Sequence, residues 1–247
     1  MARSRFRTPR LVALLLLSWL PIQAAAQAPT AQAPAAPASA TEPTPPRTEA
    51  RHGSFLERAA QGNIDVLWVG DSITDWWARA GVEVWNASFA SLNAANFGIA
   101  GDTTNGVLWR MRNGELQGFQ AKLIILMLGT NNLRRHTPAD IAEGNRLIVE
   151  EFRRQQPQAK VLVLGVFPRG ADAANPARAQ IHELNGYLAE LADGENVLFM
   201  DIGDRFLAPD GTLTEEVMPD GLHPSAVGYQ IWADAIGETV RELLGAP

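Results

Sequence analysis

The sequence of 247 residues contains no cysteine. This absence excludes disulfides, a thiol nucleophile, thiolate metal ligands and lipid attachment through an N-terminal cysteine. A domain of about 200 residues buries enough apolar surface to fold without disulfides, even after export. Histidine is scarce as well, with four residues in the chain, so few side chains are available as a base near neutral pH.

Acidic residues are absent from residues 1–26, which have the pattern of a secretory signal peptide. Four arginines, at positions 3, 5, 7 and 10, precede an apolar stretch over 11–20 and a small-residue cleavage site at 24–26. The apolar stretch is shorter than the roughly 20 residues that a membrane-spanning helix needs. We therefore expect export to the periplasm or the extracellular space, with an uncleaved anchor as the alternative.

Cleavage after Ala26 would leave 17 basic and 27 acidic residues, a net charge of −10. Such a balance disfavours nucleic acid and anionic lipid surfaces as partners. It leaves a small-molecule or glycan substrate as the expected partner, without stable membrane insertion after signal cleavage.

Composition divides the rest of the chain into two parts. Residues 27–50 are rich in Ala, Pro, Thr and Gln and poor in large apolar side chains, so we expect a disordered linker. Residues 51–247 have ordinary globular composition and the length of one domain.

Within that domain, strand-like and helix-like stretches alternate. Short apolar runs predict strands over 64–69, 94–99, 122–128, 160–167 and 196–201. Capping residues and prolines predict helices over 54–60 and 82–89 and others that begin near 103, 137, 175 and 225. This alternation is typical of an α/β fold with a parallel sheet and helices on both faces.

Ser72 lies on the predicted turn between the first strand and the next helix, in the sequence Gly70-Asp71-Ser72-Ile73. Ligands of open parallel sheets bind at the carboxyl ends of the strands, and N–H groups at a helix start favour negative charge. Ser72 is therefore a candidate nucleophile whose own N–H faces a developing oxyanion. The alternative is a simple N-cap.

His223 is the best-placed histidine to act as a base for Ser72. It follows Asp220 by three residues, a spacing that allows a carboxylate to reach Nδ1 and leaves Nε2 for the serine. His136 lies near another expected site loop and is the only competitor, because His52 lies at the domain edge and His182 inside a helix.

Four blocks of the sequence together resemble the SGNH/GDSL hydrolase superfamily of serine esterases. They are residues 70–73 (GDSI), 96–103 (NFGIAGDT), 129–132 (GTNN) and 220–223 (DGLH). Two positions depart from the usual pattern, with Ile73 in place of Leu and Asn132 in place of Asp.

The resemblance assigns roles to individual residues. Ser72 would be the nucleophile, His223 the base and Asp220 its partner, while the Ser72 N–H, the Gly101 N–H and the Asn131 amide would form the oxyanion hole. Such a site needs no cofactor and no metal. Trp76, Trp77 and Trp109 are predicted to line a pocket or to lie in the core.

Residues 96–116 and 156–165 are especially similar to the catalytic subunits of platelet-activating factor acetylhydrolase, and bacterial GDSL-like esterases are similar too. The likeness spans roughly residues 62–244 and implies a flavodoxin-like three-layer α/β/α sandwich with a mostly five-stranded parallel sheet. It also implies a short acyl group such as acetyl. Those subunits are cytosolic, so their lipid substrate is not carried over to a chain with a secretion signal.

We therefore expect a secreted serine esterase with an acyl-enzyme intermediate, acting as a carbohydrate O-acetylesterase. A lipid esterase, lysophospholipase or thioesterase is the alternative within the same chemistry. The alternative from a different class is an inactive carbohydrate- or lipid-binding module on the same scaffold.

Overall fold

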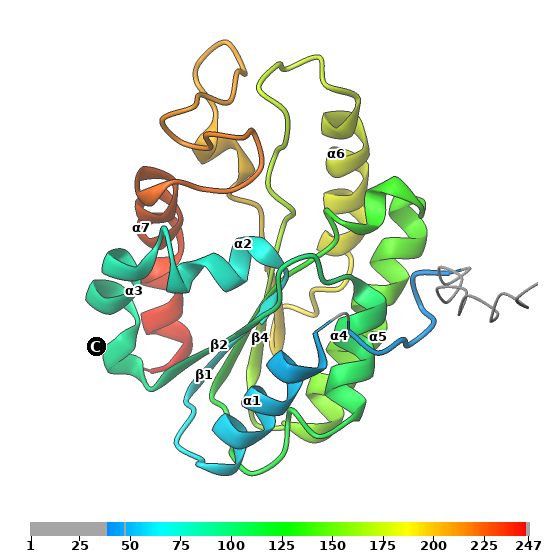
Figure 1. The fold of residues 1–247 in the computed structure, drawn as a ribbon, viewed down its shortest axis with the longest axis vertical. Helices are drawn as coiled ribbons and strands as arrows, with labels where there is room; N and C mark the ends of the chain where they lie inside the picture. The colour runs from blue at the N-terminus through cyan, green and yellow to red at the C-terminus, as the bar shows by residue number, and fades with distance from the viewer. Residues whose placement is uncertain (1–38, 47, 246–247) are drawn as a thin grey trace, which may run out of the picture. The chain divides into compact units, whose positions relative to one another are not determined.

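A parallel sheet forms the centre of the molecule in the computed structural model, which describes residues 39–46 and 48–245. The strands lie in the order β2-β1-β3-β4-β5, and every neighbouring pair is parallel (Figure 1). The strands are β1 (Val66–Gly70), β2 (Ala94–Gly98), β3 (Leu123–Met127), β4 (Lys160–Leu164) and β5 (Val197–Met200). The sheet confirms the predicted fold class.

Helices cover both faces of this sheet and complete the three layers (Figure 1). One apolar core packs α1, α4, α5 and α6 against the sheet, and a second packs α3 and α7 against the other face. The helices are α1 (Glu49–Ala60), α2 (Ser72–Asp75), α3 (Val82–Ser88), α4 (Thr104–Arg112), α5 (Pro138–Gln155), α6 (Pro176–Ala189) and α7 (Ala226–Leu243).

Strand β1 shows why the predicted strands are unbroken apolar runs. Leu67 and Val69 belong to the first core, whereas Val66 and Trp68 belong to the second. Side chains of a strand alternate between faces, so a strand covered on both sides needs apolar residues at every position.

The longer helices begin where local capping chemistry predicts. Thr137 accepts a hydrogen bond from the N–H of Asp140 at the start of α5, and Asn175 and Ser225 cap α6 and α7 in the same way. These side chains satisfy N–H groups that have no acceptor inside the helix.

The expected boundary between linker and domain at residue 51 is too late. Helix α1 begins at Glu49, and Ser54 lies inside it rather than at its N-cap. The preceding residues 39–46 also pack on the domain: the Ala40 side chain is buried, and the Thr104 hydroxyl donates to the Ala40 carbonyl at 2.7 Å. Composition missed this because small residues make their contacts here through backbone groups.

The expected signal peptide over 1–26 and the first part of the expected linker, 27–38, lie outside the described residues. Within the described part of the chain, no helix is both long enough and apolar enough to span a membrane.

Candidate active site

Ser72 is the first residue of α2, directly after the carboxyl end of β1. The turn leaves no room for a side chain at Gly70, where a Cβ would lie 2.6 Å from the Met127 carbonyl oxygen. Asp71 caps α2, with Oδ1 accepting from the Ile73 N–H at 2.9 Å. Tyr229 of α7 donates to the Ile73 carbonyl at 2.6 Å and fixes the helix from the opposite side. The Ser72 N–H has no acceptor inside α2, since it belongs to the first turn.

The structure brings Ser72, His223 and Asp220 together in one hydrogen-bonded series. Ser72 Oγ lies 2.9 Å from His223 Nε2, and His223 Nδ1 lies 2.6 Å from Asp220 Oδ2. The other Asp220 oxygen accepts from the backbone N–H groups of Leu222 and His223. Burial raises the pKa of Asp220, but the hydrogen bonds and charge of His223 and the Leu222 N–H together outweigh it and hold the pKa below its usual value. Asp220 therefore stays ionised beside the imidazole.

Gly101 and Asn131 follow β2 and β3, the two strands that flank β1. Gly101 has a φ of 79°, a conformation that glycine adopts without strain. Asn131 Nδ2 donates to the Asp102 carbonyl at 2.9 Å, which fixes the amide against the Gly101 loop. An amide has two N–H donors, so one remains for a ligand.

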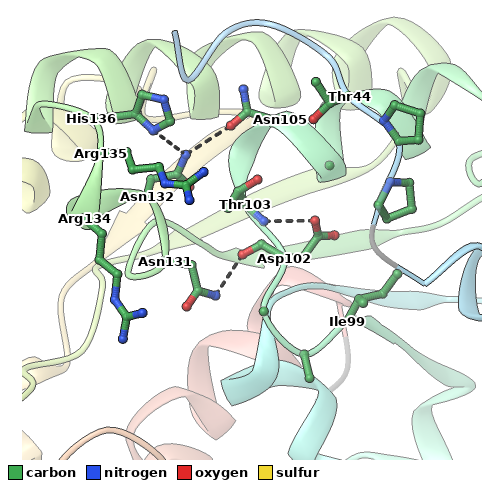
Figure 2. Close-up of a pocket in the computed structure, with 15 residues that line it drawn as sticks. Thr44, Ile99, Asp102, Thr103, Asn105, Asn131, Asn132, Arg134, Arg135 and His136 are labelled. Carbon is green, nitrogen blue, oxygen red and sulfur yellow. Dashed lines mark hydrogen bonds between the residues drawn. The ribbon is translucent and has the colours of Figure 1, made fainter. Parts of the chain in front are cut away.

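Asn132, the departure from the usual block, has a structural role. Its Oδ1 accepts from the Thr104 N–H at 3.0 Å and so caps α4 from a different loop. Its Nδ2 lies 3.2 Å from His136 Nδ1 (Figure 2). His136 is therefore bonded to Asn132. The imidazole within hydrogen-bond distance of Ser72 is that of His223. His182 is exposed on α6, as expected.

The three tryptophans have different surroundings. Trp77 is fully buried in the core, whereas Trp76 stacks on the His223 imidazole with ring centroids 4.1 Å apart. Trp109 contacts His52 edge to face at 5.0 Å. Of these three tryptophans, only Trp76 contacts a proposed catalytic residue, and no sequence pattern indicated that its indole would face the histidine.

A cavity of about 360 Å³ lies beside Gly101 and Asn131. Figure 2 shows its lining side chains, with the Asn131 and Arg134 side chains extending from one loop. The remaining lining combines polar and apolar residues and comprises Thr44, Pro45, Pro46, Ile99, Ala100, Asp102, Thr103, Asn105, Gly106, Asn132, Arg134, Arg135 and His136. Sequence reasoning missed the contribution of residues 44–46, which it placed in a linker.

Arg169 lies on the loop after β4, close to this site. Its Nη1 donates to the Thr130 carbonyl and hydroxyl at 3.3 Å each. Burial lowers the pKa of Arg169, and the positive charge of Arg134 lowers it further, while the carboxylates of Asp71 and Asp220 act in the opposite direction. These interactions place Arg169 and Arg134 near each other and near the proposed catalytic residues.

Among residues 39–46 and 48–245, no group of three or more His, Asp or Glu side chains is arranged to hold a metal ion.

Sequence comparison assigns most of the domain to one family. Residues 68–231 match the model of the GDSL-like lipase/acylhydrolase family. Platelet-activating factor acetylhydrolase IB subunit alpha2 from Rattus norvegicus is 38% identical over 199 residues, covering 80% of this chain and 85% of the relative. The alpha1 subunit from the same organism is 36% identical over 194 residues, covering 78% and 82% of the two chains.

Solved structures share the fold at lower sequence identity. A GDSL-like lipase from Bacteroides thetaiotaomicron has a TM-score of 0.64 at 19% identity, covering 79% of this chain and 99% of the neighbour. An acetylxylan esterase from Geobacillus stearothermophilus has a TM-score of 0.57 at 20% identity, with coverage of 74% and 94%. At these identities the likeness establishes the fold alone.

Proposed function

This chain belongs to the GDSL-like lipase/acylhydrolase family, and we propose that it hydrolyses short acyl esters, acetyl esters in particular, with Ser72 as its nucleophile. Hydrolysis of an ester is the activity of the family. The choice of acetyl rests on the relatives named acetylhydrolases. The observation that carries the residue assignment is the continuous series from Ser72 Oγ through His223 to Asp220, at 2.9 and 2.6 Å.

The reaction would proceed in two steps. Ser72 Oγ attacks the ester carbonyl while its proton passes to His223 Nε2, and His223 then protonates the departing alcohol. Water hydrolyses the acyl-serine in the second step, with His223 acting first as base and then as acid. The Ser72 N–H, the Gly101 N–H and the Asn131 amide would stabilise the negative charge on the carbonyl oxygen.

The proposed natural substrate is an O-acetylated carbohydrate encountered after export. The polar side chains in the lining of the cavity beside Gly101 and Asn131, among them Asn105 and Arg135, support a hydroxyl-rich alcohol over a long alkyl chain. Export rests on the sequence pattern of residues 1–26. Release of acetate from acetylated glycans, compared with hydrolysis of a short-chain phospholipid ester and a thioester, separates this substrate from the alternatives.

The residue assignment is tested with Ser72→Ala and Asn131→Ala. We expect Ser72→Ala to lower kcat by about 10⁴-fold or more and to abolish labelling by a fluorophosphonate. Asn131→Ala should lower kcat by about 10²–10³-fold with little change in KM, because the oxyanion exists mainly in the transition state.

The matched control is Ser91→Ala, the same change at an exposed serine before the amino end of β2. It should leave kcat and labelling unchanged. Ester turnover by Ser72→Ala within tenfold of the parent would eliminate Ser72 as the nucleophile. An unlabelled, inactive but folded parent would instead indicate a binding module.

A further inference from the structure

We propose that the cavity beside Gly101 and Asn131 binds an alcohol that carries an acidic group, a carboxylate or a phosphate, and that Arg134 and Arg135 recognise that group. This inference rests on the proposed esterase function and names the class of its substrate.

The position of the cavity assigns it to the alcohol portion of the ester. It is bounded by Gly101 and Asn131, so a molecule inside it lies against the groups that would surround the ester carbonyl. An acetyl group ends in one methyl, which gains nothing from guanidinium and hydroxyl neighbours. The leaving alcohol is the part of the ester that suits this polar cavity.

Arg134 and Arg135 follow Asn131 in the short helix η3 (Asn132–Arg134) and in the residue after it. Both are exposed, both line the cavity, and neither forms an ion pair within the described part of the chain. In contrast, Arg110, Arg112 and several other arginines of this acidic protein are paired with carboxylates.

A third cation lies near these two arginines, and the carboxylates of Asp71 and Asp220 act on that third cation. The Arg169 guanidinium, half-buried nearby, interacts unfavourably with the charge of Arg134. Among the described residues that line the cavity, Asp102 is the one carboxylate, and it is already bound to the Arg110 guanidinium and the Thr103 N–H. An anionic ligand would reduce the repulsion between the arginines. Its carboxylate or phosphate oxygens could also accept pairs of hydrogen bonds from the guanidinium N–H groups.

Other lining residues of the cavity suit the hydroxyl groups of a sugar. Thr44 and Thr103 line it, and their hydroxyls make no hydrogen bond within the described residues. Pro45 and Pro46 add a rigid apolar surface to the lining. The volume of about 360 Å³ lies in the lower range of small-molecule sites, which fits a single acidic sugar unit.

The experiment compares three methyl glycosides acetylated at the same position: those of glucose, glucuronate and glucose 6-phosphate. We expect kcat/KM at low salt to be about 10- to 100-fold higher for an acidic ester than for the neutral one, as charge-assisted hydrogen bonds allow. Arg134→Gln/Arg135→Gln should reduce this preference to within about twofold, and added salt should weaken it in the parent. The two acidic esters distinguish a carboxylate from a phosphate.

Arg146→Gln/Arg154→Gln is the matched control, because it also removes two positive charges, from α5 residues that do not line the cavity. It should keep the preference of the parent. Hydrolysis of all three esters without a preference for the acidic ones would overturn the inference and leave the esterase function intact. A preference for an anion in the acyl group, measured with 4-nitrophenyl hemisuccinate against the acetate, would also overturn it. Hydrolysis of no ester at all would instead overturn the proposed function.

Discussion

Asp71, next to the proposed nucleophile, is a fully buried carboxylate. Its hydrogen bonds do not offset the effect of burial on its pKa. One oxygen accepts the Ile73 N–H, but Oδ2 has no hydrogen-bond partner among the described residues. Burial raises the pKa of Asp71 to about 7, against an ordinary value of 3.8, and the Asp102 carboxylate contributes in the same direction. The N-cap that starts α2 therefore costs stability once it is ionised.

The sign of this effect gives a prediction for Asp71→Asn. As pH rises from about 4 to about 7, the unfolded chain loses this proton while the folded protein holds it, so the free energy of unfolding falls. We expect the difference in Tm between Asp71→Asn and the parent to shift in favour of the variant across this window and to stay constant above it. Calorimetry at pH 5, 6, 7 and 8 checks this; a difference independent of pH would show that Asp71 is already ionised in the folded protein at pH 5.

At the scale of elements, residues 39–46 form a strap that is held to α4 and α5 by polar contacts. Asp140 of α5 accepts hydrogen bonds from the Ser39 hydroxyl at 2.7 Å and the Ala40 N–H at 3.0 Å. Asn105 of α4 donates to the carbonyls of Ser39 and Glu42 at 2.8 Å each. The strap carries Thr44 to Pro46 to the cavity, so its attachment determines the shape of the substrate site.

Asp140→Ala removes two of the bonds that hold this strap. We expect faster amide hydrogen exchange over residues 39–46 and a loss of roughly 1–3 kcal/mol in the free energy of unfolding. Relative to the parent, KM should rise more for sugar esters than for 4-nitrophenyl acetate. Glu143→Ala, one turn further along α5, is the control, because the ion pair of Glu143 among the described residues is with Arg146 on the partly exposed side of the helix. Unchanged exchange in the strap would mean that α4 alone holds it.

At the scale of the whole molecule, a buried ionic network joins α1, β2 and α4. Arg110 is fully buried and donates to Asp102 at 3.0 Å, to Glu115, and to the Phe97 carbonyl at 3.1 Å. Glu115 also bonds His52 of α1 at 2.7 Å. Burial raises the pKa values of Asp102 and Glu115, with Arg110 acting against it.

Arg110→Met should destabilise the protein by about 3–5 kcal/mol, because two buried carboxylates lose their counter-charge. Urea unfolding measures this, with Arg112→Met as the control on the same helix. Arg112 pairs with Glu151 at a partly exposed site, and losing such a pair costs about 0–1 kcal/mol. Equal losses in the two variants would contradict a stabilising role for the buried network.

The sequence by itself determined the sheet, the starts of the long helices α5, α6 and α7, and the order of the site blocks. Runs such as 122–128 predict strands covered on both faces, and capping residues such as Thr137 act through neighbours only two or three positions away. Asp220 and His223 are also local to each other, so their pairing follows from a short turn. Local chemistry of this kind can be predicted without knowledge of the fold.

Only the tertiary structure decided which distant groups meet. The stacking of Trp76 on His223, the capping of α4 by Asn132 and the buried bonds of Arg110 depend on the angles between elements, which no short-range pattern encodes. The strap over 39–46 was predicted as a linker, because its small residues have little burial energy of their own and are ordered by polar groups of α4 and α5. The sequence carried no signal for Arg134 and Arg135. The fold places them beside the proposed oxyanion site, and neither forms an ion pair with a carboxylate of residues 39–46 or 48–245.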